Sequence, residues 1–182
     1  MRRRSLAEYL LVAICAVVAA LLVQAYVVKP YRIPSESMAS TLVPRDRVLV
    51  NKVVYRTRDP HRGDIVVIDS HVLNKVLIKR IVGLPGERIA LDGGRVYIDG
   101  RALAEPYVDV TGGRREQTDP FIGTGKPWSL ESPYVIPAGH YFVMGDNREV
   151  SDDSRDWGTV PRSEIIGEAF LTYWPLSRAH RL

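Results

Sequence analysis

The sequence has few residues that could form cross-links or bind metal ions. Cysteine occurs once, as Cys15, so no disulfide can form within the chain. The four histidines, His61, His71, His140 and His180, lack the spacing of metal ligands. The HExxH and CxxC metal motifs, the GxGxxG and Walker nucleotide motifs and the GxSxG hydrolase motif are also absent. We therefore expect a fold held by packing alone, with no metal and no organic cofactor.

The chain also has little excess charge, since 25 basic residues face 21 acidic ones and the formal net charge is +4. Its densest basic clusters, Arg2–Arg4 and Arg114–Arg115, are shorter than the basic stretches that bind nucleic acid. A nucleic-acid partner is therefore not expected. With 182 residues, 46% of them hydrophobic, the chain is long enough for one globular domain, with or without an anchor.

Leu10–Val28 is a long apolar run in which Gln24 is the one strongly polar residue. At about 1.5 Å per residue, a helix of this length reaches roughly 28 Å and matches the hydrocarbon core of a bilayer. Pro30 should end the helix because proline disfavours the helical conformation of the residue before it. The greater number of arginines before the run predicts a cytoplasmic segment 1–9, a transmembrane anchor 10–28 and an extracytoplasmic domain 29–182.

A second interpretation of the apolar run is a cleavable secretory signal. The arginines near its start resemble the basic region of such signals, and Val23-Gln24-Ala25 resembles a cleavage site. The run is longer than the apolar region of most signals, which favours the anchor. Cleavage at Ala25 would also leave the segment that begins at Tyr31 at the end of the mature chain.

The rest of the sequence is typical of β-structure. Short stretches rich in β-branched residues alternate with glycine, proline and aspartate, and no long amphipathic helix interrupts them. The expected strands are 47–55, 64–68, 75–82, 88–91, 95–98, 134–136, 140–144 and 168–174, with hairpin turns at 92–94 and 99–100. We predict a mainly β fold of antiparallel sheets that form a barrel or sandwich-like catalytic domain. Residues 111–132, rich in glycine, proline and mixed charges, should form a loop or a small extension.

Two segments contain residues suited to nucleophilic catalysis. Ser37 lies in the turn-prone stretch Tyr31–Leu42, and Lys79 lies in the strand expected at 75–82. A serine can act as a nucleophile when a neutral lysine accepts its proton, and burial lowers the pKa of a lysine enough to make it neutral. Strand alternation gives Lys79 and Arg80 different surroundings. A lone lysine in a strand can equally face solvent at a sheet edge, so the pairing depends on its context.

Four segments, in order, resemble the signature boxes of the type I signal peptidases, membrane-bound serine proteases that remove signal peptides from exported proteins. They are YRIPSESMASTL at 31–42, GDIV at 63–66, KRIVGLPGE at 79–87 and GDNREVSDDSR at 145–155. The resemblance covers nearly everything from the apolar run to Trp174. Composition alone would make the last box an acidic surface loop, whereas the order and spacing of all four indicate the family.

The resemblance implies a role for each matching residue. Ser37 is the nucleophile, Lys79 is the general base, Ser35 contributes its hydroxyl to the oxyanion hole, and Ser151 orients the lysine amine. The charged residues that the resemblance places around the site are Arg80, Asp146, Asp153 and Arg155. The apolar residues that match substrate pockets for small side chains are Ile33, Met38, Leu42 and Ile78. These last four are equally compatible with an ordinary core.

The sequence departs from the family pattern at three places within these boxes. Glu36 stands where the family often has glycine, Ser40 where it usually has proline, and Glu149-Val150 where Asp-Asn is more typical. None of these changes removes a reacting group. A carboxylate at Glu36 that turned towards Lys79 would favour the protonated amine and weaken the base, so we expect Glu36 to point to solvent.

The resemblance implies a single-pass serine endopeptidase of the plasma membrane that processes signal-peptide-bearing preproteins on the extracytoplasmic face, in contact with membrane lipid. Two other functions remain compatible with the sequence. An inactive membrane-tethered β module would bind exported chains without using Ser37 or Lys79, and a self-cleaving Ser/Lys regulator would cut its own chain. The sequence does not indicate an oligomeric state.

Overall fold

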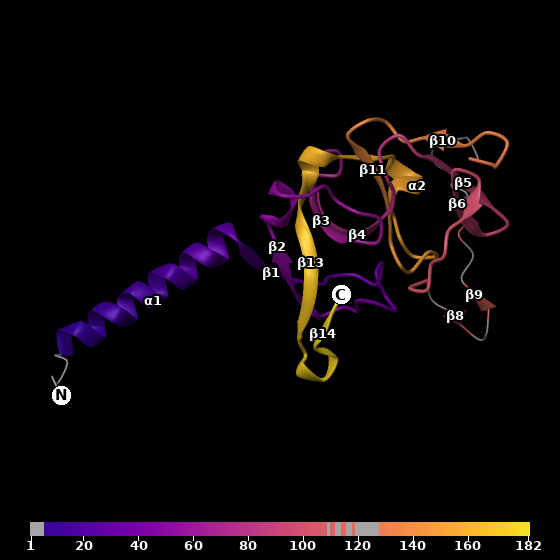
Figure 1. The fold of residues 1–182 in the computed structure, drawn as a ribbon. Helices are drawn as coiled ribbons and strands as arrows, with labels where there is room; N and C mark the ends of the chain where they lie inside the picture. The colour runs from indigo at the N-terminus through magenta and orange to yellow at the C-terminus, as the bar shows by residue number, and fades with distance from the viewer. Residues whose placement is uncertain (1–5, 109, 112–113, 116–117, 119–127) are drawn as a thin grey trace.

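The computed structural model describes residues 6–108, 110–111, 114–115, 118 and 128–182. A long helix, α1 (Leu6–Tyr26), points away from a body of β-strands (Figure 1). Every strand pairing described in the body is antiparallel, which confirms the predicted mainly β, antiparallel class. Within the part of the chain that the structure describes, no helix has the length and hydrophobicity needed to cross a bilayer.

The larger sheet has the strand order β1-β2-β13-β3-β4-β11-β12, with β14 paired to β13. Its strands are β1 (Val28–Arg32), β2 (Arg47–Asn51), β3 (Ile65–Ser70), β4 (Lys75–Gly83), β11 (His140–Met144), β12 (Val160–Pro161), β13 (Ile165–Trp174) and β14 (His180–Arg181). The order is open, because β1 and β12 are not paired in the described residues. The larger sheet therefore does not close into a barrel, which was one of the two architectures that we expected.

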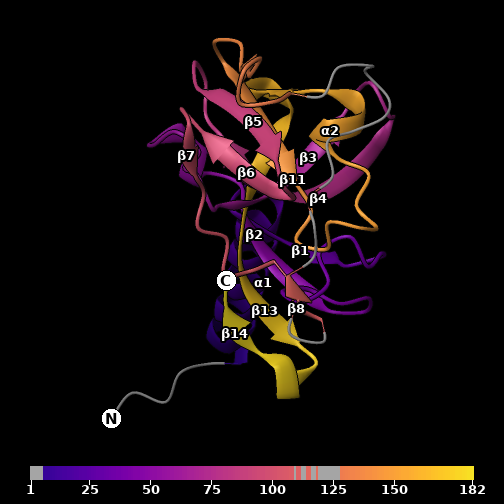
Figure 2. The same ribbon diagram turned by 90° about the vertical axis from the view of Figure 1, so that its right-hand side faces the viewer.

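A smaller sheet, in the order β10-β5-β6-β7, lies at the end of the body opposite α1 (Figures 1 and 2). Its strands are β5 (Arg88–Asp92), β6 (Arg95–Ile98), β7 (Arg101–Ala102) and β10 (Tyr134–Val135). A core cluster that includes Ile89 and Val96 of this sheet with Val82 and Phe142 of the larger one joins the two sheets. The predicted turn at Asp99-Gly100 is confirmed, with φ of +49° and +76°, values that a two-residue hairpin turn requires.

The remaining elements are short. They are the ribbon β8 (Val110–Thr111) and β9 (Arg114–Arg115), the helix α2 (Ser154–Trp157), and the 3-10 turns η1 (Val54–Arg56), η2 (Arg162–Glu164) and η3 (Leu176–Arg178). The ribbon and the buried Trp128 belong to the extension expected at 111–132, and its residues 112–113, 116–117 and 119–127 lie outside the described residues.

Several predicted boundaries differ from the observed ones. The helix expected at 10–28 begins at Leu6 and ends at Tyr26, because Val28 already pairs with Asn51 in the strand β1, which we did not predict. The strand expected at 47–55 ends at Asn51, whose side-chain oxygen accepts the amides of Val53 and Val54 and turns the chain into η1. The last predicted strand begins earlier than residue 168, since β13 starts at Ile165.

The backbone of β1 alternates between β2 and the outer edge of the sheet. The carbonyl of Val27 and the amide of Ile33, which flank β1, form hydrogen bonds on the β2 side. The even-numbered residues between them therefore turn their amide and carbonyl groups outward. Pro30, which has no amide hydrogen, occupies one of these outward positions and interrupts no ladder.

Candidate active site

The serine segment is a turn-rich loop between β1 and β2, and buried apolar side chains hold it in place. Ile33, Met38 and Leu42 are at most 3% exposed and pack in one core cluster with residues of β2 and β3. Backbone hydrogen bonds of Ile33 also close the base of the loop. Because the apolar residues point inward, the polar residues between them, Ser35 and Ser37, remain at the surface of the loop.

Ser37 is fixed from two sides. Its hydroxyl oxygen lies 3.3 Å from that of Ser35, and its carbonyl accepts the amide of Asn147 at 3.2 Å. A Cβ atom at Gly145 would lie 2.3 Å from the carbonyl oxygen of Ser37 and 2.2 Å from the hydroxyl oxygen of Ser151. Only glycine therefore allows the loop that carries Ser151 to approach Ser37 this closely.

Lys79 lies on β4 and is 3% exposed, so it is not an edge lysine that faces solvent. Its Nζ donates a hydrogen bond to Oγ of Ser151 at 2.9 Å. Burial lowers the pKa of Lys79 below its ordinary value, while the carboxylates of Asp153 and Asp152 oppose this shift. The net shift makes the neutral amine, which a general base requires, more accessible than in an exposed lysine.

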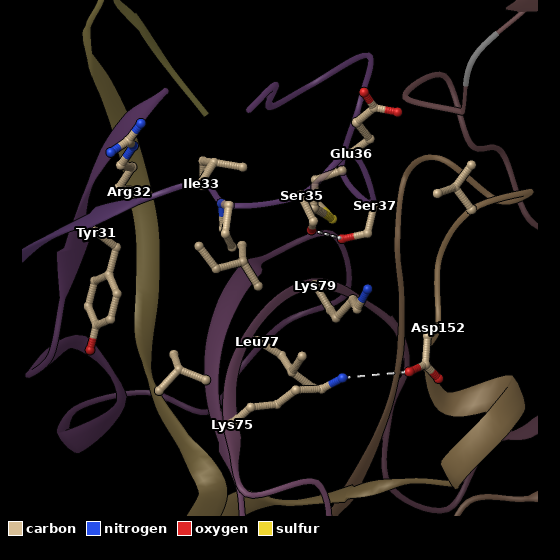
Figure 3. A pocket seen from close by; sticks show the side chains of 15 residues that line it. Tyr31, Arg32, Ile33, Ser35, Glu36, Ser37, Lys75, Leu77, Lys79 and Asp152 are labelled. Carbon is tan, nitrogen blue, oxygen red and sulfur yellow. Dashed lines mark hydrogen bonds and ion pairs between the residues drawn. The ribbon is translucent and has the colours of Figure 1, made fainter. Parts of the chain in front are cut away.

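The amine of Lys79 is turned towards the Ser37 hydroxyl in the cavity (Figure 3). No direct hydrogen bond joins the two groups among the described residues. Catalytic contacts are often long in a free enzyme and shorten when substrate binds, so this geometry is compatible with proton transfer between them.

A cavity of about 490 Å³ opens in front of the two serines and Lys79. Three of the four apolar residues matched to substrate pockets, Ile33, Met38 and Ile78, line it. The fourth, Leu42, is completely buried and does not line the cavity. Its amide donates to the carbonyl of Met38 at 2.7 Å, and its side chain packs with Met38 in the core cluster beneath the loop.

Two strands turn free backbone edges towards this cavity. β1 pairs only with β2 among the described strands, and the pairing of β11 with β4 reaches no further than Arg80. The amide of Ile81 donates to the carbonyl of Asp64 on the β3 side. By alternation, the outward backbone groups in the unpaired half of β4 belong to Val76 and Ile78.

Two arginine–carboxylate pairs surround the site. Arg80 donates to both oxygens of Asp146, at 2.8 and 2.6 Å, and Asp146 is completely buried. Arg155 donates to both oxygens of Asp153, at 2.9 and 3.0 Å, and also to the carbonyl of Ser151 at 3.1 Å. All four charged residues implied by the resemblance therefore lie around the loop that carries Ser151, and such paired hydrogen bonds fix its geometry.

The departures from the family pattern have distinct structural settings. Glu36 is exposed and its carboxylate points away from Lys79 (Figure 3), as we expected. Ser40 has a φ of +81°, which proline cannot adopt, and its hydroxyl donates to the carbonyl of Tyr107 at 2.7 Å. The serine at this position therefore connects the nucleophile loop to the segment that follows β7.

Sequence reasoning missed one buried polar group next to the site. Arg148 forms an ion pair with Glu105 in which both side chains are completely buried, and it donates to Thr118 at 2.6 Å and to the carbonyl of Gly145 at 2.9 Å. Arg148 lies inside the GDNREVSDDSR box and could have been found there. Glu105 could not, because a partner 43 positions away carries no local signal.

The sequence profile described as signal peptidase, peptidase S26, matches residues 6–174. The chain belongs to this signal peptidase family. It is 40% identical to a signal peptidase I of Leptolyngbya laminosa over 175 residues, which cover 92% of this chain and 79% of the relative. It is 34% identical to a signal peptidase IB of Staphylococcus aureus over 179 residues, which cover 96% and 93%. The crystal structure of a signal peptidase I from Enterococcus faecalis V583 aligns with a TM-score of 0.46 and 30% identity, over 61% of this chain and 97% of that one.

Proposed function

We propose that this member of the signal peptidase family removes N-terminal signal peptides from exported preproteins, with Ser37 as nucleophile and Lys79 as general base. The observation that carries the proposal is the buried amine of Lys79, bonded to Ser151 and directed into the same cavity as Ser37. The substrate class is supported by the names of the relatives, which are signal peptidases I.

The mechanism is acyl transfer through a neutral lysine. Nζ of Lys79 takes the proton of the Ser37 hydroxyl as its oxygen attacks the scissile carbonyl. The hydroxyl of Ser35 and the amide of Ser37 donate to the oxyanion that forms. Collapse of this intermediate releases the amine of the mature protein, which takes its proton from Lys79. A water molecule then gives a proton to Lys79 and attacks the acyl group, and Lys79 returns this proton to the Ser37 oxygen as the acyl bond breaks, which restores the hydroxyl and the neutral amine.

The substrate lies extended between the outward edges of β1 and β4. Backbone groups at Val76, Ile78 and Arg32 are available for pairing with an added strand. Ile33 and Met38 contact the alternate side chains that point into the cavity. The family resemblance implies that small residues stand next to the scissile bond.

We also propose that α1 (Leu6–Tyr26) anchors the enzyme in the plasma membrane, with the chain before it in the cytoplasm and the domain that begins with β1 at Val28 outside. The proposal is supported by the large apolar side chains that the structure describes in α1, at 6–21 and 26. They are mostly half or more exposed, as at Leu10 and Leu11, and belong to none of the core clusters. Protease protection in sealed vesicles tests the orientation. Digestion of the domain from the cytoplasmic side would contradict it.

The dyad is tested with the full chain in detergent micelles and a purified preprotein. Ser37→Ala and Lys79→Ala should each lower kcat by about 10³-fold or more, because neither residue alone activates the reaction. Thr57→Ala, at an exposed turn, is the control and should keep normal activity. Undiminished cleavage by either dyad variant would contradict the assignment. A wild-type chain that cuts only itself, or nothing, would instead favour the regulator or the binding module.

A further inference from the structure

A second lysine lines the same cavity. Lys75 is the first residue of β4, and its Nζ lies 3.7 Å from a carboxylate oxygen of Asp152 (Figure 3). The two side chains are 51% and 59% exposed. Exposed ion pairs of this kind contribute little to the stability of a fold. The position of this pair at the cavity therefore points to a different role.

The pair joins the same two elements as the hydrogen bond of the general base. Lys75 and Lys79 lie on one face of β4, four positions apart in a strand, and Ser151 and Asp152 are neighbours in the loop that follows β11. The loop thus contacts β4 at two points, through the 2.9 Å bond to Lys79 and the 3.7 Å pair with Lys75. The second contact lies where β4 has no paired neighbour on this side.

The charges that face Lys79 are compensated pair by pair. The carboxylates of Asp153 and Asp152 favour its protonated form, whereas Arg155 and Lys75 favour its neutral form. Arg155 pairs with Asp153 through two hydrogen bonds. Lys75 pairs with Asp152. Each carboxylate of the loop that opposes a neutral amine therefore has a cationic partner.

Two other charged groups near Lys79, those of Arg80 and Glu36, are directed elsewhere. Arg80 lies on the opposite face of β4 and is paired with Asp146. Glu36, on the nucleophile loop, is exposed and points away. Of the carboxylates that act on Lys79, Asp152 is thus the one whose compensation depends on a single exposed lysine.

We propose that Lys75 is a positioning residue of this peptidase, which through Asp152 holds Ser151 against Lys79 and neutralises the carboxylate on the open side of the site. The inference rests on the proposed function, because it assumes that Lys79 is the base. It adds a requirement for a cation at the cavity rim that takes no proton from the substrate.

The test is the pH profile of kcat/KM for the full chain in detergent with an uncharged peptide substrate. Activity rises with pH as Lys79 loses its proton. Lys75→Met leaves Asp152 without its partner, so the rise should move to higher pH, with kcat/KM about two- to fivefold lower on the rising limb. Asp152→Asn should move the rise to lower pH. The exchange Lys75→Asp with Asp152→Lys restores the pair and should return the profile close to that of the wild type.

Charge-matched controls come from exposed positions in the smaller sheet. Asp92→Asn and Arg101→Met change the net charge equally and should leave the profile unchanged. Salt at about 1 M, where the screening length is about 3 Å, should reduce the differences between wild type and variants.

Three results would overturn one part or the other. Coincident profiles for wild type, Lys75→Met and Asp152→Asn, with Lys79→Ala inactive, reject the role of Lys75 and leave the proposed function intact. Activity in Lys79→Ala rejects the proposed function itself. Effects that follow the charge of the peptide substrate instead of pH make the pair a substrate contact and also reject the positioning role.

Discussion

Lys79 shows at the residue scale how a catalytic requirement conflicts with stability. Burial lowers its pKa in the folded protein, while the unfolded chain keeps the ordinary value of 10.5. Between these two pKa values the unfolded state binds more protons, so stability rises with pH across that window and is lost as pH falls through it. At neutral pH the burial of this amine therefore lowers the free energy of unfolding.

Lys79→Met should remove that cost and abolish cleavage. We expect an increase of about 1 kcal/mol in the free energy of unfolding near neutral pH, a size common for substitutions that relieve a functional constraint. Thermal unfolding of both proteins across a pH series measures it, and the gain should shrink as pH approaches the ordinary pKa of lysine. A variant less stable than the wild type throughout the series would contradict this reasoning.

Gly145→Ala should damage the site more than the fold. The new Cβ would be too close to Ser37 and Ser151, so one of them must move, and a displacement of about 1 Å near a reacting group can lower the rate about 100-fold. Kinetics and unfolding are measured beside Gly86→Ala, where φ is +84° and no atom lies within 4 Å of the added Cβ. The control should lose about 1–2 kcal/mol of stability and keep its activity. Equal activity losses in both would argue against the contact.

Residue-scale prediction from sequence succeeded where the period of a strand decides the outcome. The different surroundings of Lys79 and Arg80 follow from alternation alone. The left-handed φ of Ser40 and the burial of Glu105 could not be predicted from alternation, because they depend on contacts between distant segments. The catalytic roles themselves remain predictions that rest on the family resemblance and the geometry.

At the scale of elements, the buried pair of Glu105 and Arg148 joins the segment after β7 to the loop that carries Ser151. Glu105→Met leaves the guanidinium of Arg148 buried without this carboxylate, which should cost about 3–5 kcal/mol in the free energy of unfolding. Glu105→Met combined with Arg148→Met removes both charges and should recover part of the loss. Denaturant unfolding of the single and double variants measures the coupling between the two side chains. If the losses of the two single variants simply added in the double variant, the coupling would be contradicted.

Strand positions could be predicted because most strands combine β-branched residues with flanking turn signals. β1 was missed because VKPYR contains a proline and two cations, a composition that argues against a strand in isolation. Its strand conformation depends on pairing with β2, a later segment of the chain. The same pairing ends α1 before the predicted position, so the boundary could not be read from hydrophobicity alone.

The whole molecule divides into an exposed helix and a packed body. A chain that begins at Val27 should keep its unfolding temperature within a few degrees, since none of the α1 side chains that the structure describes, at 6–21 and 26, belongs to the core clusters. It should no longer float with phospholipid vesicles, and it should cleave a soluble peptide better than a membrane-inserted preprotein. Vesicle flotation and paired assays measure both properties. Flotation equal to that of the full chain would contradict the role of α1 as the anchor.

A barrel was one of the two architectures that we expected, and the open order of the larger sheet is the main difference at this scale. Counting strands cannot decide closure, which depends on whether the first and last strands of the sheet meet. Here β12 pairs with β11 alone and β1 with β2 alone among the described strands, and the nucleophile loop lies at the open side. In the proposed function, the edge of β1 that this open order leaves unpaired is where a substrate strand would be added.

The outward position of Pro30 limits how a peptidomimetic inhibitor can bind. A compound that aligns with β1 can use the amide and carbonyl of Arg32, but at Pro30 it finds an acceptor and no donor. Lengthening the compound along the outer edge of β1 towards α1 should therefore add little affinity. N-methylation of the amide next to the scissile-bond mimic should lower the affinity more than removal of the residue nearest α1. The missing amide donor at Pro30 also disfavours edge-to-edge pairing of β1 with a second copy of the chain.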